Sequence, residues 1–77
     1  KKQFSIVNVD RLVRLKGDSD VTPERLVEAG LLKDLSKPVK VLGRGEVVEP
    51  ITVEAHFFST SARTKIEAAG GTIKVRA

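Results

Sequence analysis

Glycine and proline divide this sequence into short segments, and the division limits the chain to short helices and strands. Six glycines and three prolines stand between apolar runs of only a few residues, and both residue types commonly mark turns or the ends of regular elements. None of these runs approaches the ~20 apolar residues that a membrane-spanning helix needs. A chain of 77 residues has room for one domain around one hydrophobic core. We therefore expect residues 1–77 to form a single small domain.

Alternation of apolar and polar residues predicts several short strands. Successive side chains of a strand point to opposite faces of the sheet, so a period of two indicates a strand with one buried face. The expected strands cover residues 4–7, 39–42, 51–55 and 72–76, and a further apolar run covers 47–48. The glycines of residues 43–46 indicate a tight turn, which we interpret as the turn of a hairpin.

Capping residues predict two helices, at residues 23–29 and 60–69. Threonine or serine at the N-cap satisfies free N–H groups, and glycine just after a helix adopts the left-handed conformation that ends it. The caps are Thr22 and Gly30 for the first helix and Ser59 and Gly70 for the second. Ile66 is the one large apolar side chain of the second helix, so we expect it to be buried.

A further short helix is expected to begin near Asn8 or Asp10, and residues 16–20 form a turn-rich break after it. Short strands are thus interleaved with short helices along the whole chain. This pattern predicts a small α/β domain built in layers.

The chain lacks the residues for most metal or catalytic sites. It has one histidine and no cysteine, whereas a zinc site made by protein alone needs about four such ligands. A Ser-His-Asp site would have to pair His56 with Ser59 or Ser61, but both serines stand where a helix cap is expected. Residues 43–46 lack the Lys-Ser/Thr ending of a nucleotide-binding P-loop. We therefore expect no enzyme activity, metal, cofactor or small-molecule substrate.

The charge of the chain favours a polyanionic partner. The formal net charge is +4 and the sequence pI is about 9.8. Residues 1–39 carry eight Lys or Arg and six Asp or Glu, and residues 40–77 carry six and four, so each half has a charge of +2. Residues 35–45 and 55–66 contain basic side chains and no acid, which makes them the first candidates for RNA contact.

Basic residues in these two stretches stand at positions that suit phosphate. Arg44 lies between two glycines, so the backbone around it could come close to an RNA backbone. Arg63 and Lys65 follow a helix start, where free N–H groups and the helix dipole attract anions. We expect these three side chains to be exposed and to contribute little to folding stability. Because the chain has only three phenylalanines as platforms for bases, RNA would be held through its backbone and shape.

Several motifs follow one another along nearly the whole chain. The N-terminal motifs are Val7-Asn8-Val9, Val21-Thr22-Pro23-Glu24 and Glu28-Ala29-Gly30-Leu31. The C-terminal motifs are Lys40-Val41-Leu42-Gly43-Arg44-Gly45-Glu46, Pro50-Ile51-Thr52-Val53, Ala55-His56-Phe57-Phe58-Ser59, Ser61-Ala62 and Lys65-Ile66-Glu67-Ala68-Ala69-Gly70-Gly71. Together they resemble the C-terminal domain of the bacterial L-fifteen family of large-subunit ribosomal proteins.

The resemblance implies a structural protein of the large ribosomal subunit, located in the cytoplasmic ribosome. Such a protein binds large-subunit ribosomal RNA and contacts neighbouring ribosomal proteins. The family's C-terminal domain consists of layered strand-strand-helix turns, in agreement with the small α/β domain expected from the residues. Members usually also have a basic N-terminal arm rich in Gly, Arg and Lys, which is absent from this chain.

We predict a surface that contacts RNA and consists of Lys37, Lys40, Arg44, His56, Ser59, Ser61, Arg63 and Lys65. An alternative is a protein–protein interaction module without direct RNA contact, which would dock a partner through exposed strand edges or through Leu31-Leu32. Salt separates the two, because phosphate binding weakens steeply as salt rises and an apolar contact barely responds. A hydrolase that uses His56 is not expected.

Overall fold

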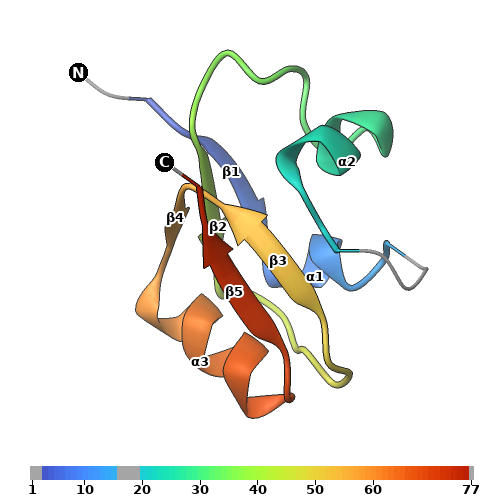
Figure 1. Ribbon diagram of the computed structural model, residues 1–77, viewed down its shortest axis with the longest axis vertical. Coiled ribbons are helices and arrows are strands. Elements are labelled where there is room, and N and C mark those ends of the chain that lie inside the picture. Colours follow the sequence, from blue (N-terminus) through green and yellow to red (C-terminus); the bar gives the residue numbers. More distant parts are fainter. Residues whose placement is uncertain (1–2, 16–19, 77) are drawn as a thin grey trace.

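Two small parallel sheets form the frame of the computed structural model, which describes residues 3–15 and 20–76 (Figure 1). The first sheet has the order β1-β2-β4, with β1 (Ser5–Asn8), β2 (Val39–Leu42) and β4 (Phe57–Phe58). The second sheet pairs β3 (Thr52–Ala55) with β5 (Thr72–Val75). The helices are α1 (Val9–Leu12), α2 (Pro23–Glu28) and α3 (Thr60–Ala68). The expected α/β domain of short strands and short helices is confirmed.

Helices and loops separate the paired strands in the sequence because parallel strands need a crossover connection. The chain passes through α1 and α2 between β1 and β2, and through α3 between β3 and β5. Val21, just before α2, forms an isolated parallel bridge with Val53 of β3, which ties α2 to the second sheet. Within residues 3–15 and 20–76, no helix has the length and apolar character needed to span a membrane.

The four expected strands are present, with ends shifted by no more than one residue. The apolar run at residues 47–48 does not form a strand, and the hairpin interpretation of residues 43–46 is wrong. The strand before them, β2, pairs in parallel with β1 and β4, and the next strand, β3, belongs to the other sheet. The glycine-rich segment is therefore a connection between sheets, held by contacts that are distant in sequence.

Both expected helices are present and begin at the predicted caps. The Thr22 hydroxyl accepts a hydrogen bond from the Arg25 N–H, and the Ser59 hydroxyl accepts one from the Ala62 N–H, at 3.2 and 3.1 Å. The glycines after the helices have φ values of +81° and +86°, the left-handed conformation that glycine adopts most easily. The expected short helix is present as α1. The break expected at residues 16–20 cannot be compared in the same way, because residues 16–19 lie outside the described residues.

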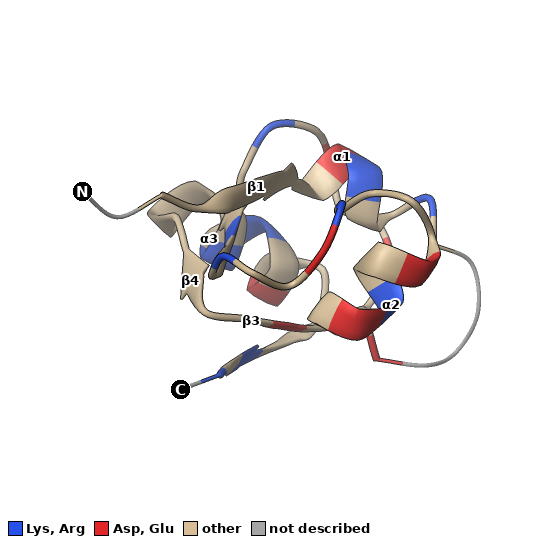
Figure 2. Cartoon of the chain, turned by 90° about the horizontal axis from the view of Figure 1, so that it is seen from above, with Lys and Arg blue, Asp and Glu red and all other residues tan. Residues whose placement is uncertain are grey.

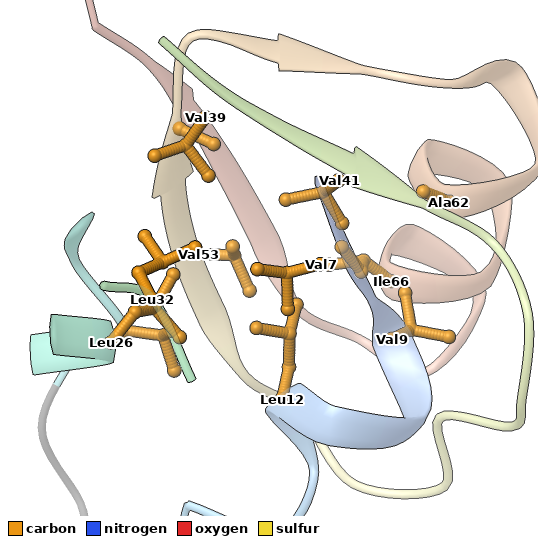
Figure 3. Close-up of a cluster of buried hydrophobic side chains, with 12 residues drawn as sticks. Val7, Val9, Leu12, Leu26, Leu32, Val39, Val41, Val53, Ala62 and Ile66 are labelled. Carbon is orange, nitrogen blue, oxygen red and sulfur yellow. The ribbon is translucent and has the colours of Figure 1, made fainter. Parts of the chain in front are cut away.

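The hydrophobic core lies between the two sheets and the three helices (Figure 3). Its buried residues are Val7, Val9, Leu12, Val21, Leu26, Leu32, Val39, Val41, Val53, Ala55, Ala62 and Ile66. Ile66 is fully buried, as expected. Because β2 occupies the middle of the first sheet and both of its inward valines have no exposed surface, the outward side chains of this strand and its neighbours form the outer face of the domain.

Ion pairs join α2 to the second sheet. The Arg76 guanidinium donates to both carboxylate oxygens of Glu24, at 2.7 and 2.9 Å, and also to Glu54. Hydrogen bonds from Arg76 lower the pKa of Glu24 to about 2, so this carboxylate is ionised at neutral pH. Lys74 pairs with Asp20 at 3.2 Å. Asp20 before α2, Glu24 on α2 and Glu54 on β3 are thus matched by Lys74 of β5 and by Arg76 just after it; Figure 2 shows the acidic segments of α2 and β3.

Candidate nucleic-acid interface

The Gly43–Gly45 loop, which follows β2, lies against the start of α1. The Asp10 N–H donates a hydrogen bond to the Arg44 carbonyl oxygen at 3.0 Å, and the Arg44 N–H donates to the Asn8 side-chain oxygen at 3.2 Å. Asn8 stands at the N-cap of α1 but makes no side-chain capping bond there. Its side chain fixes the loop instead of the helix.

Lys65 attaches the same loop to α3. Its ammonium group donates hydrogen bonds to the carbonyl oxygens of Gly43 and Gly45, at 2.7 and 2.5 Å. The expectation that Lys65 is exposed is therefore wrong, because this half-buried cation donates to two loop carbonyls. From these contacts we now expect Lys65 to contribute to folding stability. The loop bridges the start of α1 and the first turns of α3.

Both glycines of the loop are required by close contacts. A Cβ atom at Gly43 would collide with the Ser61 hydroxyl and lie only 2.9 Å from the Ala62 nitrogen. Gly45 has a φ of +107°, and a Cβ there would collide with Asp10. The loop approaches both helices because neither glycine has a side chain.

Arg44, between these glycines, directs its side chain to solvent. The side chain is 72% exposed, and its Nε lies 3.6 Å from a carboxylate oxygen of Asp10. That separation is too long for a hydrogen bond, so the guanidinium donors remain available to a ligand. The loop thus fixes the backbone of Arg44 and leaves its charged group exposed.

The structure brings Arg44, Ser59, Ser61 and Lys65 together at the C-terminal end of β2. The Ser59 hydroxyl caps α3 and lies 3.3 Å from the Ser61 hydroxyl. Arg63 is exposed in the same turns of α3, and its side chain makes no hydrogen bond or ion pair with the described part of the chain. This group is the first half of the predicted surface.

The remaining predicted residues, Lys37, Lys40 and His56, lie at the opposite end of β2. The Nδ1 atom of His56 accepts a hydrogen bond from the Val39 N–H at 2.9 Å, and the His56 N–H donates to the Val39 carbonyl at 3.0 Å. Because Nδ1 is the acceptor in this bond, Nε2 is the ring nitrogen left to donate. His56 therefore joins the end of β3 to the start of β2.

Lys40 lies on the outer face of the first sheet, among apolar side chains. Its ammonium group is 5.4 Å from the centre of the Phe4 ring, and the Phe4 and Phe57 rings pack edge to face with centroids 4.9 Å apart. Lys37 is exposed in the loop before β2. The predicted surface is consequently divided between the two ends of one strand.

Several exposed cations lie outside the surface predicted from the sequence. Apart from Lys37, Lys40 and Arg63, the basic residues whose side chains make no hydrogen bond or ion pair within residues 3–15 and 20–76 are Arg11, Arg14 and Lys33. Arg11 is the basic residue of α1, and α1 lies on the side of the domain away from the C-terminal end of the chain (Figure 2). Arg11 lies outside the acid-free stretches of the sequence because Asp10 precedes it.

Comparison with known proteins decides the family. The family model for the 50S ribosomal proteins L15 and L18e and their 60S counterpart matches residues 6–74. The large ribosomal subunit protein uL15 of Thermosipho africanus (strain TCF52B) is 53% identical over 76 residues, which are 97% of this chain and 52% of that protein. The chain belongs to the L15/L18e family of ribosomal proteins. The resemblance to the L-fifteen family is thereby confirmed, and the chain spans about half the length of this relative.

This membership also bears on the expected lack of catalysis, since the matched family consists of ribosomal proteins and not of enzymes. The matched region, residues 6–74, includes both ends of β2 and the Gly43–Gly45 loop. The arrangement around the loop therefore belongs to the part of the chain that identifies the family.

We predict that replacing Lys65 with methionine lowers the free energy of unfolding by about 1–3 kcal/mol. Methionine retains an apolar stem but removes the charged donor from the carbonyls of Gly43 and Gly45. As a matched control, Arg63→Met on the same helix should change it by less than about 0.5 kcal/mol. Urea denaturation followed by circular dichroism measures both. Equal midpoints for the two variants would show that the Lys65 amine does not hold the loop.

A second pair of variants tests the role of His56. Glutamine should cost about 1–3 kcal/mol of stability, since its amide does not reach the Nδ1 position and the Val39 N–H loses its partner. Asparagine places an amide oxygen close to the Nδ1 position and should cost clearly less. Thermal unfolding compares the two, and an asparagine variant less stable than the glutamine variant would contradict the role assigned to Nδ1.

Proposed function

We propose that this chain is a structural constituent of the large subunit of the cytoplasmic ribosome and binds large-subunit ribosomal RNA. The family match and the name of the relative support this role, and the net charge of +4 agrees with a polyanionic partner. The observation that carries the proposal is the fixed loop that presents Arg44 beside the start of α3.

The proposed contacts near the loop are phosphate contacts. Arg44 and Arg63 are exposed guanidinium groups on a fixed loop and on a helix, and such groups form paired hydrogen bonds with phosphate oxygens. Ser61 supplies a hydroxyl donor beside them. Lys65 acts by holding the loop and not by binding RNA itself. Phosphate contacts position RNA without reading its sequence, so shape would decide where the domain sits.

We place a second contact at the other end of β2. Lys37 is exposed there, and the Nε2–H of His56 is a free donor as far as the described residues show, because only Nδ1 is used in bonding Val39. The two groups of donors would let a folded RNA cover β2 from end to end. With the single imidazole engaged in this structural bond, we propose that the chain performs no reaction.

Neighbouring ribosomal proteins are proposed as further partners. Ile6 and Phe57 are large apolar residues that are 56% and 44% exposed on the outer face of the first sheet. Apolar contact there would respond little to salt, in contrast to the phosphate contacts. This difference lets one titration separate the two kinds of partner.

We predict that the double change Arg44→Ala and Arg63→Ala weakens binding to large-subunit ribosomal RNA about equally for every fragment that binds. It should also flatten the plot of log affinity against log salt concentration by about 1.5–2 units, because each phosphate that is no longer neutralised removes roughly one unit from the slope. Fluorescence anisotropy at salt concentrations from about 50 to 200 mM measures both quantities. Lys65 is left intact so that the fold is preserved.

The matched control is Lys74→Ala, which removes an exposed cation that is paired with Asp20 on the other side of the domain. It should leave affinity and salt slope nearly unchanged. If the double variant binds with the affinity and slope of the unchanged chain, the surface at the Gly43–Gly45 loop is not the RNA contact.

A further inference from the structure

Three side chains lie in one row across the outer face of the first sheet. The strand register places Ile6 of β1 beside Lys40 of β2, and Lys40 beside Phe57 of β4. Residues paired in neighbouring strands carry their side chains on the same face of a sheet. Phe4 completes the group, since its ring packs against the Phe57 ring and its ring centre lies 5.4 Å from the Lys40 ammonium nitrogen. We call these four residues the Lys40 patch.

The Lys40 patch exposes the apolar surface of a parallel sheet to solvent. Ile6 is 56% exposed and Phe57 is 44% exposed. All three strands of this sheet run parallel, and sheets of this kind are nearly always covered on both faces. The hydrophobic core covers the inner face. The outer face is therefore suited to a partner that covers it.

Lys40 decides the chemistry of such a partner. Its side chain is half-buried and makes no ion pair or hydrogen bond within residues 3–15 and 20–76. A partner that lies on both Ile6 and Phe57 would also cover Lys40 between them and remove its ammonium group from water. An unpaired cation is costly to bury, and contact with an aromatic ring offsets only part of that cost. The covering partner therefore has to supply a carboxylate.

A second copy of this chain does not meet this requirement. A symmetric dimer through this face would place the same patch on both sides, so Lys40 would meet a second Lys40 and no carboxylate. RNA fits poorly as well, because nucleic-acid interfaces are polar and rich in positive charge, whereas this patch has one cation among three apolar side chains. Both arguments favour a different protein.

We propose that the Lys40 patch binds a segment of a neighbouring ribosomal protein in which apolar side chains flank one Asp or Glu. The carboxylate pairs with Lys40, and the apolar side chains cover Ile6 and Phe57. Neighbouring strands lie ~4.8 Å apart, so the row spans roughly 10 Å and a short segment covers it. Lys40, which was predicted from the sequence to contact RNA, then belongs to a protein contact between the two RNA contacts proposed at the ends of β2. This inference rests on the proposed function and specifies the chemistry of its protein partner.

Photo-cross-linking in large ribosomal subunits that contain the chain identifies what covers the patch. Phe57 is replaced by the photoreactive residue benzoylphenylalanine, and mass spectrometry identifies what is captured on irradiation. We expect a segment of one ribosomal protein that has an Asp or Glu among apolar residues. The same replacement at Val48, which is 83% exposed and lies outside the patch, is the control and should not capture that segment.

Charge reversal tests the ion pair, with the captured protein purified and titrated against the chain. Lys40→Glu should weaken binding at least about tenfold, whereas Lys40→Arg keeps the cation and should change the affinity by less than about threefold. Replacing the captured Asp or Glu by Lys should restore the binding of Lys40→Glu. Circular dichroism checks that each variant is folded. If Lys40→Glu does not fold, Lys40→Gln takes its place and should weaken binding about fivefold.

The outcomes separate this inference from the proposed function. A cross-link from position 57 to RNA or to a second copy of the chain, or no cross-link at all, overturns the inference while the proposed function stands. A captured protein that does not bind the chain, or that binds Lys40→Glu as tightly as the unchanged chain, overturns it too. If the chain is absent from large subunits, the proposed function itself fails.

Discussion

The two hydrogen bonds from Lys65 to the Gly43–Gly45 loop are the interaction on which the rest of the structure depends. They attach the loop to α3, while bonds from Asn8 and Asp10 attach it to the start of α1. One cation therefore links the N-terminal and C-terminal halves of a domain too small to rely on its core alone. The same bonds fix the backbone of Arg44, so the stability of the fold and the geometry of the proposed RNA contact have one origin.

Charge is divided between the two sides of the domain in a way that agrees with this geometry. On the side of the second sheet, Arg76 and Lys74 are matched by carboxylates, among them that of Glu24, whose pKa is lowered to about 2. Near α1 and the loop, Arg11 and Arg44 keep exposed donors. A net charge of +4 therefore understates how much unmatched positive charge an RNA would meet on one side.

Much of the fold could be predicted from features that depend only on residues close together in the sequence. The serine and threonine caps, the glycine stops, the four strands and the burial of Ile66 belong to this class. The hairpin interpretation failed because strand pairing is decided by contacts distant in sequence. The bond from Lys65 to Gly43 spans 22 residues, and that from Val39 to His56 spans 17.

Hydrogen exchange at the Asp10 amide is the most direct measurement of the central claim, that Lys65 holds the loop in place. This N–H lies in the first turn of α1, where an amide has no partner within its own helix, and it donates to the Arg44 carbonyl. Its protection therefore reports on the loop alone. We predict protection in the unchanged chain and exchange at least about tenfold faster in Lys65→Met, measured under conditions where both are folded. An Asp10 amide that exchanges freely in the unchanged chain, or equally fast in both, would contradict the account.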